Sequence, residues 1–143
     1  MPYRFRDEIA TADVAFEAWG ETLEEVIIAA ADATLNVMVA DLDAVVDRVR
    51  RSIHAEADAA DMLLFEVLQE LIYYKDAERL LLRVPKVELE CGAGRFSLKA
   101  EAYGEEIDPT RHELVVDVKA VTLHRFEVVE TENGWQAQVI LDI

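Results

Sequence analysis

The sequence predicts an α+β fold, a two-layer sandwich in which two helices pack on a mostly antiparallel sheet. Two segments repeat apolar residues at the three-and-four spacing of amphipathic helices, and several others alternate apolar and polar residues as half-buried strands do. Short turn segments join those strands into hairpins. The chain has 143 residues, of which 52% are hydrophobic. This size and composition suit a single domain, residues 1–143, with a substantial core.

The N-terminal half holds both predicted helices. Alternation over residues 13–20 predicts a half-buried strand. The helix predicted over residues 22–39 begins with a capping box, Thr22-Leu23-Glu24-Glu25, in which the first and last side chains each bond the other residue's backbone amide. Residues 44–56 alternate as another strand. A second helix is predicted over residues 58–76, where acidic residues lie favourably at the N-terminal end of the helix dipole.

The C-terminal half is predicted to consist of strands and turns. Cys91 falls on the apolar face of its strand and is predicted to be a core residue rather than a nucleophile. Asn133-Gly134 indicates a hairpin, because this pair accepts the positive φ of a type I′ turn. Strands are expected over residues 79–84, 87–91, 96–103, 114–129 and 135–143, with the longest irregular segment at 104–112.

The charge of the chain restricts its partners. Thirty acidic and 14 basic residues give a net charge of −16. Such a surface repels phosphate backbones, so we expect no tight direct binding to nucleic acid, and it attracts basic proteins or hard cations. No apolar run approaches the roughly 18 residues of a membrane span, and we see no signal-peptide region. With one cysteine and neither feature, we expect a cytoplasmic protein without membrane association.

The end of the last predicted strand is a candidate site. Asp142 lies beside Ile143, whose terminal carboxylate adds to a compact group of anionic oxygens. The simpler interpretation is that Asp142 is a solvated carboxylate at a strand end. Asp13, at the start of the strand over residues 13–20, is in the same way usually a turn or cap residue.

Several short motifs follow one another along the chain. They are Thr11-Ala12-Asp13-Val14, Gly20 with Thr22-Leu23-Glu24-Glu25, Leu64-Phe65-Glu66 through Leu71-Ile72-Tyr73, Tyr103-Gly104-Glu105, Asp108-Pro109 with Arg111-His112, Val118-Lys119-Ala120-Val121-Thr122, and Gly134-Trp135 through Leu141-Asp142-Ile143. In this order they resemble the motifs of the archease family. One departure lies before Thr11, where the family usually has His and this chain has Ala10. A second lies in the second helix, where Val67 and Gln69 stand in place of the family's Trp and Asn.

The resemblance implies an accessory protein rather than an enzyme. The role that it implies is activation of the RtcB-type RNA ligase, which joins tRNA halves and repairs broken RNA. Proteins of the family promote charging of a ligase histidine with GMP, support multiple turnover and broaden nucleotide use. The family also binds a divalent cation, calcium in known members, and carried over to this chain the ligands are Asp13, Asp142 and the main-chain oxygens of Ile143. Hard oxygen donors of this kind suit calcium or magnesium.

Three cationic or titratable residues are candidates for contacts with the ligase or the nucleotide. They are Lys119, Arg111 and His112, and for each of them a structural salt bridge or a surface role is an equal alternative. Two other functions stay open. One is a small metal-dependent hydrolase or nucleotide-modifying enzyme with Asp13, His112 and Asp142 around a metal, although the sequence lacks a nucleophile elbow, a P-loop and a His-rich metal motif. The other is a more general chaperone-like binding module.

Overall fold

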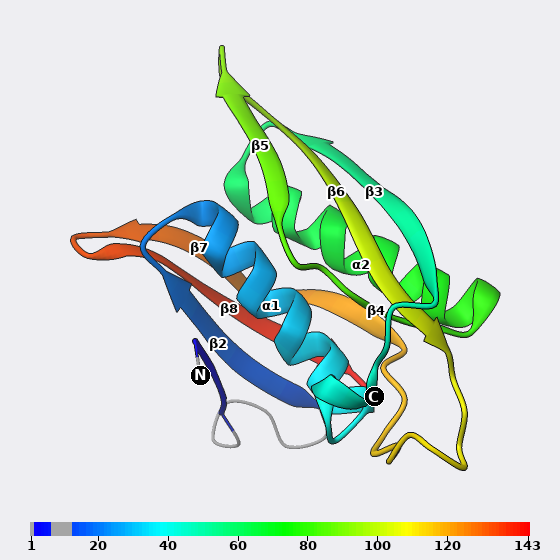
Figure 1. The fold of residues 1–143 in the computed structure, drawn as a ribbon. Helices are drawn as coiled ribbons and strands as arrows, with labels where there is room; N and C mark the ends of the chain where they lie inside the picture. Colours follow the sequence, from blue (N-terminus) through cyan, green and yellow to red (C-terminus); the bar gives the residue numbers. More distant parts are fainter. Residues whose placement is uncertain (1, 7–12) are drawn as a thin grey trace.

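The computed structural model describes residues 2–6 and 13–143. Figure 1 shows two helices and the strands that surround them. The elements are β1 (Tyr3–Phe5), β2 (Val14–Gly20), α1 (Leu23–Met38), the 3-10 helix η1 (Leu42–Ala44), β3 (Val49–Ala57), α2 (Ala60–Glu78), β4 (Leu80–Arg83), β5 (Val87–Gly92), β6 (Arg95–Glu106), β7 (Ala120–Thr131) and β8 (Gly134–Asp142).

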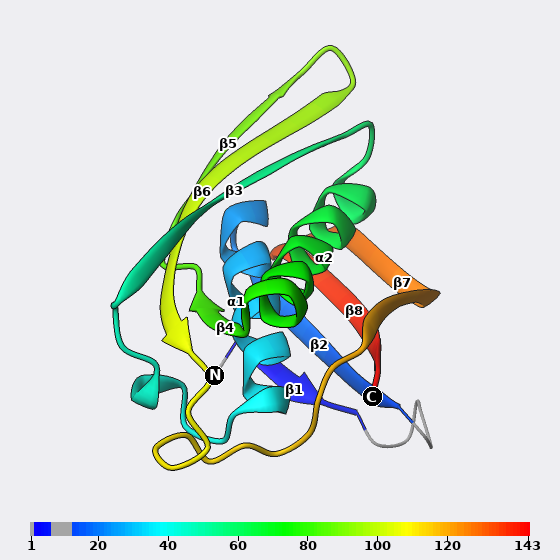
Figure 2. The same ribbon diagram turned by 90° about the vertical axis from the view of Figure 1, so that its right-hand side faces the viewer.

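The strands form two antiparallel sheets, which confirms the α+β class and the antiparallel pairing. One sheet has the order β1-β2-β8-β7, and the other has the order β3-β6-β4 with β5 also paired to β6. The sequence predicted one sheet covered by both helices. Instead both helices lie between the two sheets and contact each of them (Figure 2). Alternation identifies strands but does not tell which strands share a sheet.

The helix α1 fits this central position. It is buried along most of its length, and small Ala residues make up much of its surface, so both sheets can approach its backbone. The predicted capping box is present: the Thr22 hydroxyl accepts a hydrogen bond from the Glu25 amide at 3.2 Å, and the Glu25 carboxylate accepts one from the Glu21 amide at 2.8 Å. The predicted start of this helix is therefore confirmed. The Glu25 carboxylate, however, accepts from the amide of Glu21 rather than from that of Thr22.

The helix α2 runs past its predicted end near residue 76. Lys75, at the predicted end, has a side chain that is only 5% exposed. Its ammonium donates to the Val118 carbonyl at 2.7 Å and to the Asp117 carboxylate at 2.5 Å. This contact fastens α2 to the segment that leads into β7.

Among the described residues, neither helix combines the length and apolarity that crossing a membrane requires.

Two predicted strands are shorter in the structure. Residues 44–56 give η1 and then β3, and residues 114–129 join β7 only from Ala120. The segment 114–119 makes a single bridge, between Leu114 and Val39. Within β7 the register shifts between Thr122 and Glu127, and Arg125 has a φ of 53°. A bulge of this kind breaks the alternation on which the long strand was predicted.

Two local predictions are wrong. Cys91 is exposed, because the β5–β6 hairpin projects beyond the helices (Figure 1) and its apolar face has no covering layer there. The last hairpin exists, but its two-residue connection is Glu132-Asn133, with Thr131 paired to Gly134. Gly134 has the positive φ, 142°, and a Cβ at this position would lie 2.2 Å from the Gly20 carbonyl oxygen. Close backbone approach, rather than a type I′ turn, accounts for this glycine.

Candidate functional site

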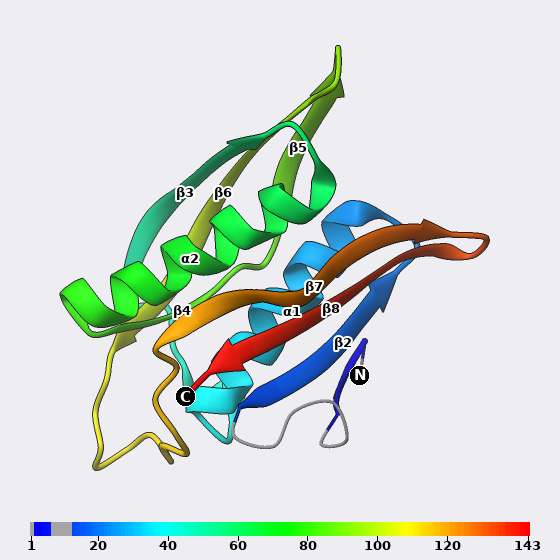
Figure 3. The same ribbon diagram turned by 180° about the vertical axis from the view of Figure 1, so that it is seen from behind.

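The strands β2 and β8 bring Asp13 and Asp142 to neighbouring positions. Val14 pairs with Leu141 in the antiparallel register, so the residue before Val14 lies opposite the residue after Leu141. Figure 3 shows β8 running between β2 and β7, with the C-terminus at the end of β8. On its other side Asp142 pairs with Ala120, and its carbonyl oxygen accepts a hydrogen bond from the Lys119 amide at 2.8 Å. The backbone around Asp142 is therefore held from the β7 side.

The face of the sheet that these carboxylates occupy follows from alternation. Leu141 and Val14 belong to the core against the helices, so Asp13 and Asp142 point to the opposite face. Both are half-buried. Within the described part of the chain, neither carboxylate has an ion-pair partner, whereas Glu17 on the same face is paired with Arg4 at 2.9 Å.

These oxygens suit a hard cation in kind. Two neighbouring carboxylates attract a cation, and calcium prefers carboxylate and carbonyl oxygens. In the described residues no group of three or more His, Cys, Asp or Glu side chains is placed to hold a metal. A cation at this position would take Asp13, Asp142 and main-chain oxygens of Ile143 as ligands, and its remaining ligands would be water or other backbone oxygens. Ala10, the departure from the family pattern, lies outside the described residues.

The candidate contact residues Arg111 and His112 lie in a separate, buried cluster around Glu105. The Glu105 side chain is 3% exposed and accepts hydrogen bonds from the Val46 amide at 2.8 Å and from the Arg111 guanidinium. The His112 ring, fully buried, places its Nε2 3.1 Å from the same carboxylate. Arg111 also donates to the Ala44 carbonyl at 3.0 Å. The cluster joins the β6–β7 connection to the chain before β3.

The protonation of His112 follows from its contacts. Its Nδ1 accepts a hydrogen bond from the Asp108 amide at 2.9 Å, which assigns the proton of the neutral ring to Nε2, beside Glu105. Burial lowers the pKa of His112 below the ordinary 6.5, and the Arg111 guanidinium lowers it further. A neutral ring whose two nitrogens face these partners does not join Asp13 and Asp142 around a metal, as the hydrolase alternative requires.

Lys119 is the candidate contact residue that lies near the carboxylate pair. Its backbone is bonded to Asp142, its side chain is exposed, and within the described residues its ammonium has no ion-pair partner. A contact through Arg111 or His112 would require the cluster around Glu105 to open. The role of all three residues in binding a partner stays a prediction.

Sequence reasoning missed Glu105 as the residue around which this cluster is organised. The sequence predicts an irregular segment at this position, but β6 continues to Glu106. The Glu105 carboxylate is buried between the segment before β3, which holds Val46, and the β6–β7 connection, which holds Arg111. The adjacent Arg111-His112 pair was the available signal, since a buried carboxylate needs hydrogen-bond donors.

Comparisons with known proteins cover nearly the whole chain. The model of the Archease protein family matches residues 3–143. The protein archease of Pyrococcus furiosus is 37% identical over 134 residues, which are 93% of this chain and 94% of that protein. That of Aeropyrum pernix is 38% identical over 93% of this chain and 92% of its own length.

Solved structures agree with these matches. The solution structure of protein 1598 from Methanobacterium thermoautotrophicum superposes with a TM-score of 0.85 at 35% identity, and the match covers 99% of each chain. A crystal structure from Thermotoga maritima, described as an archease and possible chaperone, has a TM-score of 0.65 at 16% identity over 94% of this chain and 93% of that one, which shows the shared fold. From the family match and the relatives above 30% identity, we conclude that this chain belongs to the Archease protein family.

Proposed function

We propose that this protein is an accessory protein, and not itself an enzyme, that activates an RtcB-type RNA ligase of tRNA splicing and RNA repair. It would promote charging of the ligase with GMP and so sustain multiple turnover. The proposal also assigns it a divalent cation, calcium, held by Asp13, Asp142 and main-chain oxygens of Ile143. Support comes from the family match over residues 3–143 and, above all, from the register that puts Asp13 opposite Asp142.

The surface charge fits a basic partner. At −16 the protein attracts a positively charged ligase at long range, and such steering raises the association rate at low salt. At the end of β8 the backbone of Lys119 is bonded to Asp142, and the Lys119 side chain is exposed. We infer that this end of the first sheet faces the ligase. The cation would fix the two carboxylates in one geometry, and Lys119 would bind an acidic or phosphate group next to it.

A guanylylation assay tests the proposal. The ligase from the same source is incubated with GTP and a divalent metal, with and without substoichiometric amounts of this protein. We expect faster and repeated charging of the ligase when the protein is present. Asp13→Ala and Asp142→Ala should remove the stimulation while the variants remain folded, and the exposed β7 variant Glu127→Ala should retain it.

Each other outcome has a meaning. Wild-type stimulation by both Asp variants would refute the site. Turnover of a substrate by the purified protein alone would favour the hydrolase, and protection of unrelated proteins from aggregation would favour the chaperone-like module. If a competent ligase does not respond, the activator function is contradicted, and Ala10→His would then test whether the missing family histidine is the reason.

A further inference from the structure

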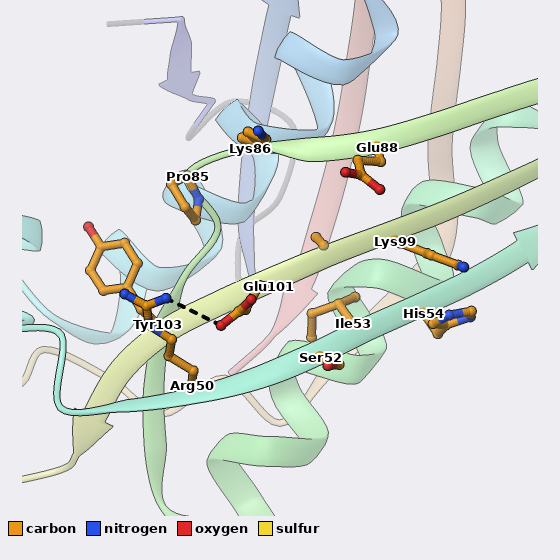
Figure 4. A pocket seen from close by; sticks show the side chains of 11 residues that line it. Arg50, Ser52, Ile53, His54, Pro85, Lys86, Glu88, Lys99, Glu101 and Tyr103 are labelled. Atoms are coloured by element: carbon orange, nitrogen blue, oxygen red, sulfur yellow. Dashed lines mark hydrogen bonds and ion pairs between the residues drawn. The ribbon is translucent and has the colours of Figure 1, made fainter.

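The other sheet carries a pocket on the face turned away from the helices, and its lining includes two lysines that have no ion-pair partner within the described residues. The pocket has a volume of about 540 Å³. Arg50, Ser52 and His54 of β3 line it, alternating with the buried residues of that strand. Across the register, Arg50 pairs with Tyr103 and His54 pairs with Lys99. Figure 4 shows these side chains together with Lys86, which comes from the connection between β4 and β5.

Two of the cations have no partner. Within the described residues, neither Lys86 nor Lys99 makes an ion pair or a side-chain hydrogen bond, although acidic residues outnumber basic ones by 30 to 14 in the chain. Most other cations are paired: Arg51 with Glu78 at 2.7 Å is one example. The ammonium groups of Lys86 and Lys99 are therefore available to an anion from outside the chain.

The other polar groups of the pocket add donors and limit the net charge. The guanidinium of Arg50 is bound by Asp47 at 2.8 Å and, within the pocket, by Glu101 at 3.4 Å. Glu88 pairs with Lys99 in the register of β5 and β6. The lining holds three cations and two carboxylates, and Asp47, which binds Arg50 from outside the lining, balances the formal charge. A serine hydroxyl, a tyrosine hydroxyl and an imidazole add hydrogen-bonding groups beside the two lysines. Ammonium and hydroxyl donors of this kind are those that bind phosphate oxygens.

We propose that this pocket binds a small phosphate-bearing anion, with the ammonium groups of Lys86 and Lys99 as its principal contacts. A small anion experiences mainly the local charges, since carboxylates more than about 10 Å away are screened at physiological salt. A long polyanion such as RNA would instead have to lie along the acidic surface, which repels it. The half-buried ring of Tyr103 offers a surface on which a base can stack, so a nucleotide is one source of the phosphate. The site lies on a different sheet from Asp13 and Asp142 and is independent of the proposed ligase activation.

The test is a titration followed by amide chemical shifts in metal-free buffer. Pyrophosphate and adenosine diphosphate are added separately, because both carry a diphosphate and only the second carries a base. We expect shifts centred on Ser52, His54, Lys99 and Tyr103, and an affinity that falls as salt rises. Equal affinities for both probes would identify the phosphate as the recognised group. Tighter binding of the nucleotide that is lost in Tyr103→Leu would identify a nucleotide as its source.

Matched variants decide whether the pocket itself binds. The double variant Lys86→Gln/Lys99→Gln should weaken pyrophosphate binding at least tenfold. The control Arg79→Gln/Arg125→Gln removes the same charge from two exposed cations that, within the described residues, also have no ion-pair partner, and it should change the affinity less than twofold. Equal weakening by both double variants, absence of binding at millimolar pyrophosphate, or tighter binding of a short single-stranded RNA than of pyrophosphate would each overturn the proposal.

Discussion

The cluster around Glu105 and the pair Asp13–Asp142 are two opposite uses of acidic residues. Glu105 is buried, and its carboxylate is surrounded by donors from Val46, Arg48, Arg111 and His112. Asp13 and Asp142 are half-buried neighbours that, within the described residues, have no ion-pair partner. A carboxylate whose bonds are satisfied inside the chain stabilises the fold, whereas a pair left without a counter-ion is available to one from outside. The difference between the two regions is testable.

The largest expected effect is on stability, from Glu105→Ala. Removing this carboxylate leaves the buried His112 ring and the Val46 amide without a partner, and we expect a loss of about 3 kcal/mol of unfolding free energy. The neighbouring exposed residue gives the control: Glu106→Ala should change it by less than about 0.5 kcal/mol. Denaturant unfolding measures both. Equal losses in the two variants would mean that the cluster is not the anchor that its contacts indicate.

The second effect is a calcium response that depends on the carboxylate pair. At a calcium concentration of one hundred times Kd, wild-type protein should gain about 2.7 kcal/mol of unfolding free energy. Asp13→Asn and Asp142→Asn should lose this gain, and without calcium they should be at least as stable as wild type, because the repulsion between the carboxylates is removed. Thermal unfolding with calcium and with a chelator distinguishes these states. A wild-type response retained in both Asn variants would place the cation elsewhere.

The third effect sharpens the comparison on a single face of the sheet. Glu17 lies on the same face as Asp13 and Asp142 but is 7% exposed and paired with Arg4 and Arg6. Because these pairs are partly open to solvent, Glu17→Gln should lower the unfolding free energy by only about 1–2 kcal/mol. It should leave the calcium response unchanged. If Glu17→Gln removed the calcium response as well as lowering the unfolding free energy, the paired and unpaired carboxylates on this face would both contribute to calcium binding.

The smallest effect is a pH dependence from His112. Its pKa is lower in the folded protein than the ordinary 6.5, so below pH 6.5 the unfolded chain binds a proton that the folded chain does not. The corresponding stability is complete above pH 6.5 and decreases as the pH falls towards the folded value. In His112→Asn, whose side chain can still accept from the Asp108 amide, this part of the pH dependence should be absent. The unfolding free energy of both proteins is measured between pH 7.5 and 5.5. If it depends on pH equally in the two proteins, the prediction is wrong.

How far the sequence predicted the fold can be seen from particular elements. The capping box at Thr22 and the hairpin before β8 follow from short-range rules, since their bonds lie within a few residues of the chain. The strand over residues 13–20 follows from its local alternation, although its hydrogen bonds go to β1 and β8. The end of α2 and the start of β7 did not follow, because Lys75 and Val118 meet 43 residues apart in sequence. Exposure of Cys91 likewise depends on where the β5–β6 hairpin lies relative to the helices.

The sequence by itself determined the class of the fold, the family and the acidic surface, because periodicity, ordered motifs and charge are properties of the chain. Only the tertiary structure decided that the helices lie between two sheets, and that β2 pairs with β8 so that Asp13 lies opposite Asp142. It also decided that Glu105 holds Arg111 and His112, and that Lys86 and Lys99 share a pocket. The physical reason is common to these cases: burial and pairing of a charged group depend on elements distant in sequence, and no local pattern encodes which of them will meet.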